Sequence, residues 1–361
     1  MRALLAVVAA AAAPLLFAPA AARACAPAPR RGGDTVAIAD EEAMIAFDPA
    51  TGREDFIRRA SFRTKEQDFG FLVPTPTKPE LGEVDDAVFE RLAKQIEPRV
   101  IEKVRYVPEL TATCMFFSRA ASKSAAPTAI AAATVQVLDE QRVGGFDAAV
   151  LRSDDEGALA KWLADHGYDE RPELAAWLAP YVAKRWIVTA FKIAKAKDPS
   201  RVDLMVDPGA VATKAVRMTF TTDKPMFPYR EPADQRATSA ALASRMLRVF
   251  VVTPGRAAGA LGNGDAWPGR AVWANTPSEA LLGSLGVKTA PGVWLTAFED
   301  RSSPRPGVDD LFFTPSKDTT PIEPPPIEHV DERPIPIPVD LIAGGALIAW
   351  LLARRRKPSP P

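Results

Sequence analysis

The sequence contains very little of the two residue types that most often carry catalysis and metal binding. Among its 361 residues are two histidines, His166 and His329, and two cysteines, Cys25 and Cys114. A site built from several histidines is therefore excluded. A triad of serine, histidine and aspartate would have to use His166, which precedes a glycine and is more simply a residue at a helix C-terminus. We predict no catalytic residue, no metal site and no cofactor.

The chain also lacks an excess of charge of one sign. It has 45 basic and 45 acidic residues, and six of the basic ones lie in the two terminal segments. The part between those segments then carries 39 basic residues against 45 acidic ones. A mildly acidic protein does not suit nucleic acid, because binding phosphates requires a basic surface. We therefore expect no nucleic-acid partner.

No apolar run reaches the roughly 20 residues of an ordinary membrane helix, but a shorter run stands at each end. At the start, Arg2 precedes an apolar run over residues 3–17, and a stretch of small residues ends at Ala24. A charged start, an apolar middle and a small-residue exit are typical of a secretory signal peptide. We predict a signal peptide over residues 1–24, cleaved between Ala24 and Cys25.

The second apolar run, residues 341–353, is followed directly by four cations, Arg354, Arg355, Arg356 and Lys357. Such a cluster holds its side of a membrane helix in the cytoplasm. We predict a transmembrane helix over residues 339–353 and a basic cytoplasmic tail over residues 354–361. The protein is then a single-pass protein of the bacterial inner membrane, with its ectodomain in the periplasm or at the cell exterior.

Two other interpretations of this C-terminal segment stay open. The 13 residues of the apolar run span roughly 20 Å of helix, less than the ~30 Å of a hydrocarbon core, so the run would also suit a buried C-terminal helix. Alternatively, Gly344 and Gly345 followed by the arginine cluster resemble a sorting tag of bacterial exported proteins, which is cut near its glycines.

The two cysteines, Cys25 and Cys114, both belong to the predicted exported part. In an oxidising compartment they most simply form one disulfide. The alternative is a lipid on Cys25, which would be the first residue of the mature chain. Ala24 suits the sequence that precedes a lipidated cysteine, whereas Arg23 does not.

Between the two ends, the apolar pattern alternates between strand and helix periods. Residues 35–39 and 43–47 are rich in β-branched and aromatic residues, and a turn from Asp48 to Gly52 leads into a return strand over residues 54–62. Helices are expected over residues 84–96, from a Ser153 N-cap to Gly167, from Pro172 onward, and over residues 278–285. Strands grouped with a few helices predict an α+β fold, mostly antiparallel, with three or four helices.

Proline is concentrated in residues 315–338, where eight of 24 residues are proline. Such segments act as extended, semi-rigid spacers. We therefore predict a stalk over residues 315–338, which joins an exported domain over residues 25–314 to the membrane helix. That domain has a further candidate division near residue 130.

Two groups of residues would suit a partner as well as the protein itself. Trp267, Trp273 and Trp294 have the ring type that stacks on sugars, although packing in the core explains them more simply. Arg58 and Arg59 would suit an anionic partner, whereas an exposed pair of arginines on a strand is the default interpretation.

Several separated motifs occur in a characteristic order. They are VAIADEEAMI (36–45), DPATGRE (48–54), FIRRA (56–60), DFGFLVPTP (68–76), RVGGFD (142–147) and VLR (150–152). Together they resemble the bacterial domain-of-unknown-function family 2330 over most of the predicted ectodomain. The resemblance implies an exported bacterial protein, often with a signal peptide and a C-terminal membrane segment, and no established activity. It transfers no catalytic residue.

These observations predict an uncharacterised envelope protein with a non-catalytic binding or scaffolding role. Its partners would be the membrane and an unknown envelope protein or glycan. The alternative is an envelope hydrolase that uses paired carboxylates, which would require two carboxyl groups about 5–9 Å apart in a cleft.

Overall fold

The computed structural model describes residues 23–24, 26–33, 36–65, 69–111, 141–169, 171–193, 210–235, 245–287 and 292–355. The chain divides into two compact units. The first unit comprises Met1–Ile96 and Val137–Glu323, and the second comprises Glu97–Gln136 and Pro324–Pro361. This division differs from the predicted one, because residues 97–136 group with the C-terminal segment and the later boundary follows Glu323 instead of residue 314.

The largest sheet of the first unit is built on strands β3 (Ala37–Asp48) and β4 (Arg53–Arg63), which the predicted Asp48–Gly52 turn connects. In this turn Asp48 Oδ1 accepts a hydrogen bond from the Ala50 N–H at 3.0 Å, and Gly52 has a φ of 67°. The two predicted strands 35–39 and 43–47 form one strand with a bulge between Ile38 and Glu41. The other strands are β6 (Glu80–Glu83), β11 (Ala210–Ala212), β12 (Val216–Thr221), β15 (Met246–Thr253), β17 (Arg270–Asn275) and β18 (Trp294–Asp300).

The strand order in this eight-stranded sheet is β17-β18-β15-β3-β4-β12-β6, with β11 also paired to β4. All its neighbours are antiparallel except β3 and β15, which are parallel. A five-stranded antiparallel sheet has the order β2-β5-β10-β9-β8. Its strands are β2 (Ala26–Ala28), β5 (Gly70–Thr75), β8 (Gln141–Val143), β9 (Phe146–Leu151) and β10 (Ile187–Ile193).

Two smaller sheets complete the strands of the first unit. One joins β13 (Met226–Phe227), β19 (Leu311–Pro315) and β16 (Ala257–Leu261), and the other joins β1 (Arg23–Ala24) to β14 (Tyr229–Arg230). In the second of these, Ala24 is the register partner of Tyr229. The last residue of the predicted signal peptide therefore has a strand partner in the first unit.

The first unit is layered because side chains on successive strand residues point to opposite faces. On β4, Phe56 and Phe62 belong to a core that also contains Phe71 and Phe191 of the five-stranded sheet, whereas Ile57 belongs to a second core on the opposite face. A third core lies on the outer face of the five-stranded sheet. The two large sheets thus enclose the main core, and each has a smaller core on its outside.

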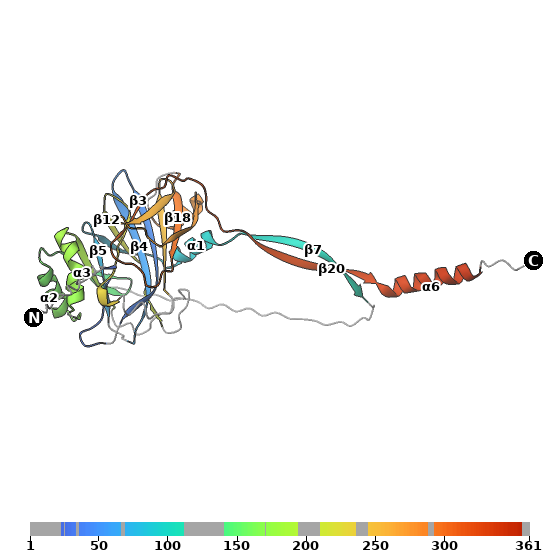
Figure 1. Cartoon of the computed structure of the whole chain (residues 1–361), viewed down its shortest axis with the longest axis horizontal. Helices are drawn as coiled ribbons and strands as arrows, with labels where there is room; N and C mark the ends of the chain where they lie inside the picture. Colours follow the sequence, from blue (N-terminus) through green and yellow to red (C-terminus); the bar gives the residue numbers. More distant parts are fainter. Residues whose placement is uncertain are drawn as a thin grey trace, which may run out of the picture. The chain divides into compact units, whose positions relative to one another are not determined.

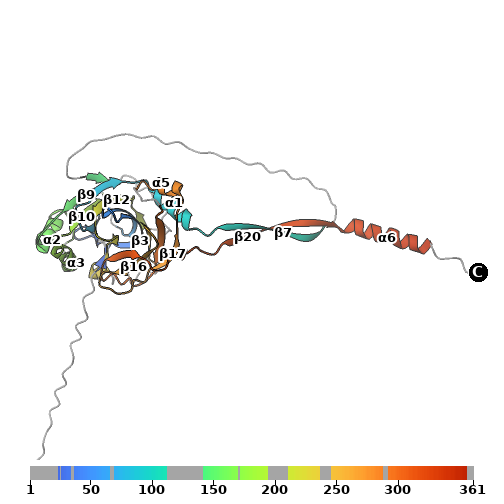
Figure 2. The ribbon, with the colours of Figure 1, turned by 90° about the horizontal axis from the view of Figure 1, so that it is seen from above.

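Four helices cover the outer cores: α1 (Ala87–Ile96), α2 (Glu156–Asp165), α3 (Pro172–Ala183) and α5 (Glu279–Ser284). Helices α2 and α3 lie together on one side of the strands and α1 on the other (Figures 1 and 2). Helix α3 begins at Pro172, as predicted, but the N-cap of α2 is Asp155 and not Ser153, because Asp155 Oδ1 accepts the Ala158 N–H at 2.6 Å. The prediction of a mostly antiparallel α+β fold is confirmed in its broad form.

The second unit contains strand β7 (Val100–Thr111), strand β20 (Ile327–Pro338) and helix α6 (Val339–Arg355). Strands β7 and β20 pair in parallel and form a two-stranded ribbon, which continues from β20 into α6 (Figure 1). The predicted stalk is therefore paired over its last 12 residues. Among the residues that the structure describes, no helix combines the length and the hydropathy that crossing a bilayer requires.

The remaining terminal predictions fall partly outside the described ranges. Gly344 and Gly345 lie within α6, and Arg354 and Arg355 form its last turn. Cys25 and Cys114, and with them the predicted disulfide, lie outside the described residues, as do Arg356 and Lys357.

Candidate functional site

The most unusual feature of the first unit is a set of charged side chains inside its core. Arg58 and Arg59 on β4 are 3% and 5% exposed, and the neighbouring strand β3 supplies Glu41 and Glu42 as their partners. Arg58 Nε donates to Glu41 Oε1 at 2.8 Å, and Arg59 Nε donates to Glu42 Oε2 at 2.8 Å. The interpretation of the two arginines as an exposed pair is wrong, because both faces of this sheet are covered and acids on β3 neutralise them.

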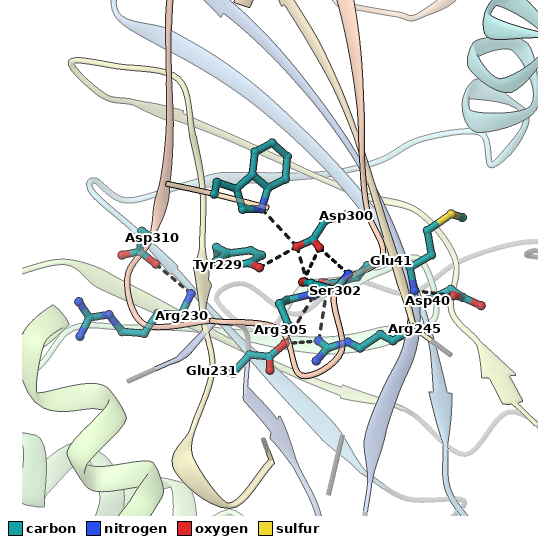
Figure 3. A network of polar contacts seen from close by, with 12 residues as sticks. Asp40, Glu41, Tyr229, Arg230, Glu231, Arg245, Asp300, Ser302, Arg305 and Asp310 are labelled. Atoms are coloured by element: carbon teal, nitrogen blue, oxygen red, sulfur yellow. Dashed lines mark hydrogen bonds and ion pairs between the residues drawn. The ribbon is translucent and has the colours of Figure 1, made fainter. Parts of the chain in front are cut away.

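Glu41 is the centre of the larger network, which Figure 3 shows from close by. Besides Arg58, its carboxylate meets Arg305 Nη1 at 3.3 Å and Arg245 Nη2 at 3.9 Å. Arg245 also forms an ion pair with Glu231, and Arg305 Nη1 lies 3.5 Å from the same carboxylate. All five side chains are at most 5% exposed. The network therefore joins β3 and β4 to three segments between strands. These are the segment after β14, the segment before β15 and the segment between β18 and β19.

Asp300, at the end of β18, extends this network toward the aromatic core. Its Oδ2 accepts hydrogen bonds from the Tyr229 hydroxyl at 2.7 Å and from Trp267 Nε1 at 3.2 Å. Its Oδ1 accepts the Ser302 hydroxyl at 2.5 Å, and Arg305 Nε is 3.7 Å from Oδ2. Three arginines and three carboxylates, Glu41, Glu231 and Asp300, thus balance each other in charge.

The arginines decide the protonation of these acids. Burial alone would raise the pKa of Glu41, but Arg58, Arg305 and Arg245 outweigh it and hold that pKa below its ordinary value. Burial would likewise raise the pKa of Asp300, and Arg305, Ser302 and Tyr229 reverse the effect. Both carboxylates are ionised, saturated with donors and closed to solvent. This arrangement holds strands together and does not suit transfer of protons to a substrate.

A smaller polar cluster connects helix α3 to the start of β19. Tyr181 donates its hydroxyl hydrogen to Asp310 Oδ1 at 2.8 Å, and the Arg230 N–H reaches the same atom at 3.4 Å. Asp310 is fully buried, and its Oδ2 has no hydrogen-bond partner in the described residues. Burial raises the pKa of Asp310 to about 6, despite the Tyr181 hydrogen bond and the charge of Arg230, which lower it.

Glu54 on β4 is the second buried acid with a raised pKa. Its Oε2 accepts the Met226 N–H at 2.9 Å, and its Oε1 has no hydrogen-bond partner among the residues described. Burial raises the pKa of Glu54 well above the ordinary value, and the nearby charge of Asp55 adds to the effect. Neither of these acids lies among the residues that line the two cavities discussed next.

The accessible candidate site is a surface cavity of about 470 Å³ near the turn between β3 and β4. Its hydroxyl groups come from Thr51, Thr77, Thr221 and Thr222, its aromatic rings from Trp186 and Phe312, and its charges from Asp223 and Lys224. A second cavity of about 280 Å³ shares Asp223 and Lys224 and is lined mainly by prolines and phenylalanines, which include Phe47 and Phe313. The two cavities are therefore neighbours.

The hydroxyl groups of the larger cavity are held in place by strand ends. Thr77 Oγ1 lies 3.0 Å from the Thr221 carbonyl and 3.1 Å from its hydroxyl, and Thr222 Oγ1 donates to the Lys224 carbonyl at 3.0 Å. Trp186 is half-buried between Tyr181, whose ring centroid is 5.5 Å away, and the Lys184 ammonium, 5.3 Å from its ring. The cavity thus offers an immobilised ring beside ordered hydroxyls, which suits binding of a polar ligand with apolar faces.

A family described as "Uncharacterized protein conserved in bacteria (DUF2330)" matches residues 19–294. The chain belongs to this family. The resemblance found in the sequence motifs is therefore confirmed. No curated protein matches this DUF2330 chain significantly.

Among solved structures, the crystal structure of baculovirus P35 is similar to this chain, with 6% sequence identity and a TM-score of 0.38. The similarity covers 78% of the DUF2330 chain and 98% of the viral one. A likeness of this size carries no argument about fold or activity.

The structure separates the remaining predicted site residues of this DUF2330 protein. Trp267 and Trp273 are buried and Trp294 is half-buried, so core packing explains the first two and no shared platform is formed. His166 is the exposed C-cap of α2, where its Nδ1 lies 2.7 Å from the Trp162 carbonyl. Within the described ranges, no group of three His, Cys, Asp or Glu is arranged to hold a metal ion.

Sequence reasoning missed the cavity, although a signal for it exists. Three strand ends that are far apart in the chain carry the same mixture of threonine and proline: PTPTKP (74–79), TTDKP (221–225) and FTP (313–315). The structure brings all three to the paired cavities.

Proposed function

We propose that this protein is an envelope protein attached to the bacterial inner membrane through α6, and that it binds an envelope glycan without transforming it. The observation that carries the proposal is the larger cavity, where a half-buried tryptophan stands beside four threonine hydroxyls and one pair of opposite charges. Sugars present alternating apolar faces and hydroxyl groups, so a ring and fixed hydrogen-bonding groups are the chemistry that recognises them.

The membrane location is supported by the side chains of α6. Leu347, Ile348, Trp350, Leu351 and Leu352 are about half-exposed in this chain. Arg354 and Arg355 follow them, and the Arg354 guanidinium lies 4.2 Å from the Trp350 ring centroid. An apolar helix face that ends in tryptophan and arginine matches the boundary between acyl chains and anionic head groups. Exposed surface of this kind requires a partner, and lipid supplies one.

The residues that the structure describes do not favour the alternative hydrolase. The described residues that line the two cavities include one carboxylate, Asp223. Hydrolysis of a glycosidic bond by the usual mechanism requires a pair of carboxyl groups about 5–9 Å apart. Glu41 and Glu231, which share the Arg305 guanidinium, are buried and neutralised by arginines.

The binding half of the proposal is tested with purified peptidoglycan sacculi and the intact protein. Trp186→Ala removes the ring that lines the cavity and is expected to reduce co-sedimentation with sacculi by about tenfold. The matched control is Trp162→Ala, which truncates another half-buried tryptophan of the first unit, on α2 and outside the cavity. Equal binding by both variants, or binding of peptides in place of glycan, contradicts the proposal.

The location is tested separately by fractionation. The complete chain should sediment with inner membranes, and a chain that ends at Pro338 should be released. An alkaline phosphatase reporter placed after Pro315 should be active, because the proposal puts the first unit outside the cytoplasm. A chain that remains in the cytosolic fraction overturns the location and leaves the glycan test unaffected.

A further inference from the structure

The two edges of the ribbon formed by β7 and β20 are chemically different. The Ile327 N–H donates to the Arg99 carbonyl at 2.9 Å, so the main-chain groups of odd-numbered residues on β20 face β7. Because strand residues alternate, even-numbered residues face away. Pro334, Pro336 and Pro338 all occupy such even positions, where a missing N–H costs nothing in the ladder.

The same pattern leaves three prolines on the outer edge of β20. Three consecutive outward positions, 334, 336 and 338, lack a donor, so another strand cannot complete a ladder there. On β7 the outward positions are the even ones. Val100, Glu102, Val104 and Tyr106 keep their N–H groups, and Pro108 lacks one. Within the described residues β7 has no strand neighbour besides β20. The ribbon therefore has one edge, on β20, that is blocked over residues 334–338, and one edge, on β7, that is open over residues 100–106.

The ribbon also exposes apolar side chains on one of its faces. The register places β7 residues of even number on the same face as β20 residues of odd number. That face carries Val100, Val104, Tyr106, Ile327 and Ile335, each at least 45% exposed, together with the polar residues Glu102, His329, Asp331 and Arg333. An isolated two-stranded ribbon is marginal in water, and three or more strands are normally needed for stability.

We propose that the ribbon is a dimerisation element, in which β7 of one copy pairs antiparallel with β7 of a second copy. The resulting four-stranded sheet has the order β20-β7-β7-β20 and is paired through residues 100–106 of each β7, so the three outward prolines of each β20 lie on the outer edges. A second copy is the occupant that the edges favour, because this pairing consumes both open edges and leaves none for further growth. The apolar faces of the two ribbons then merge on one side of the sheet.

The test uses the full-length protein in mild detergent and two matched substitutions. Val104→Pro deletes an outward N–H on the open edge, and Val330→Pro deletes an outward N–H on the edge that the proposal leaves unpaired. Both replace a valine without disturbing the ladder between β7 and β20. Light scattering coupled to gel filtration should find a dimer for the wild type and Val330→Pro, and an association at least about tenfold weaker for Val104→Pro.

Cross-linking gives an independent measurement in a chain with Cys25→Ser and Cys114→Ser. Two copies of residue 104 would lie within about 8 Å across the new ladder, whereas two copies of residue 330 would be about 14 Å apart or more, since three strand spacings separate them. A short bis-maleimide should therefore link Val104→Cys chains and not Val330→Cys chains. A monomeric wild type, equal effects of the two prolines, or equal cross-linking at both positions overturns the proposal.

Discussion

The two units of this protein place their charged and apolar residues in opposite ways. The first unit buries arginines and carboxylates between two covered sheets, as with Arg58 and Glu41, each about 2% exposed at the side chain. The second unit keeps its ion pairs at the surface, as with Arg105 and Glu332 at 66% and 59%, and exposes valine, isoleucine and tyrosine. The first unit therefore satisfies its own side chains, whereas the second has the composition of a surface that is completed by something else.

The sharpest way to break this comparison is to remove one arginine from each unit. Arg305→Met removes the one cation that Glu41, Glu231 and Asp300 share, and breaking a buried network of this kind costs about 3–5 kcal/mol of unfolding free energy. Arg105→Met removes an exposed partner and should cost less than about 1 kcal/mol. Denaturant titration of both variants measures the difference. Similar losses would show that the two units do not differ in how they use charge.

The second prediction concerns Asp310, an acid of the first unit whose pKa is raised from 3.8 to about 6 by burial. The folded state holds its proton more tightly than the unfolded chain does, so this group stabilises the fold fully below pH 3.8. As pH rises from 3.8 to about 6 the unfolded chain loses the proton first, and up to about 3 kcal/mol of stability is lost.

Asp310→Asn keeps an acceptor for Tyr181 and removes the titration. Relative to the wild type, its unfolding free energy should rise between pH 4 and about 6 and stay higher above that range. Denaturation at several pH values measures the difference between the two proteins. Parallel profiles for the variant and the wild type would contradict the burial of an unneutralised acid at this position.

How far these features follow from the sequence depends on the range of the interaction. The β3–β4 pair follows from local chemistry, because the Asp48–Gly52 turn sets its register, and residues 41–42 and 58–59 even carry opposite charges. Local sequence does not predict their burial, since acids and arginines are normally exposed and only the covering layers of the fold decide otherwise. The cavity and the β7–β20 pairing join segments more than 100 residues apart, and no local pattern specifies such a contact. The alternating prolines fix which residues of β20 face outward, but not which strand pairs with it.

A third prediction compares one tyrosine from each unit. Tyr181→Phe removes the hydroxyl that donates to Asp310 at 2.8 Å and leaves that buried acid poorly satisfied, at a cost of about 1–2 kcal/mol. Tyr106→Phe removes a hydroxyl from a side chain that is 63% exposed on the ribbon, and should change stability by less than about 0.5 kcal/mol. Thermal unfolding measures both. A larger loss for Tyr106→Phe would mean that its hydroxyl has a partner within the protein.

The smallest expected effect concerns the ion pairs across the ribbon. Lys103 Nζ lies 2.5 Å from Glu328 Oε1, but both side chains are more than half exposed, so water screens their attraction and two long side chains lose freedom to form the pair. Lys103→Met should therefore change amide exchange across residues 100–107 by less than about threefold in dilute buffer, and not at all in 1 M salt, where the screening length is about 3 Å. If the difference persists in salt, the ion pair is shielded from solvent, as it would be on a surface that a partner covers. If salt removes the difference, the ribbon is stabilised by its hydrogen bonds and its apolar side chains. In a single copy, the described residues give β7 no strand partner besides β20, and those apolar side chains are exposed.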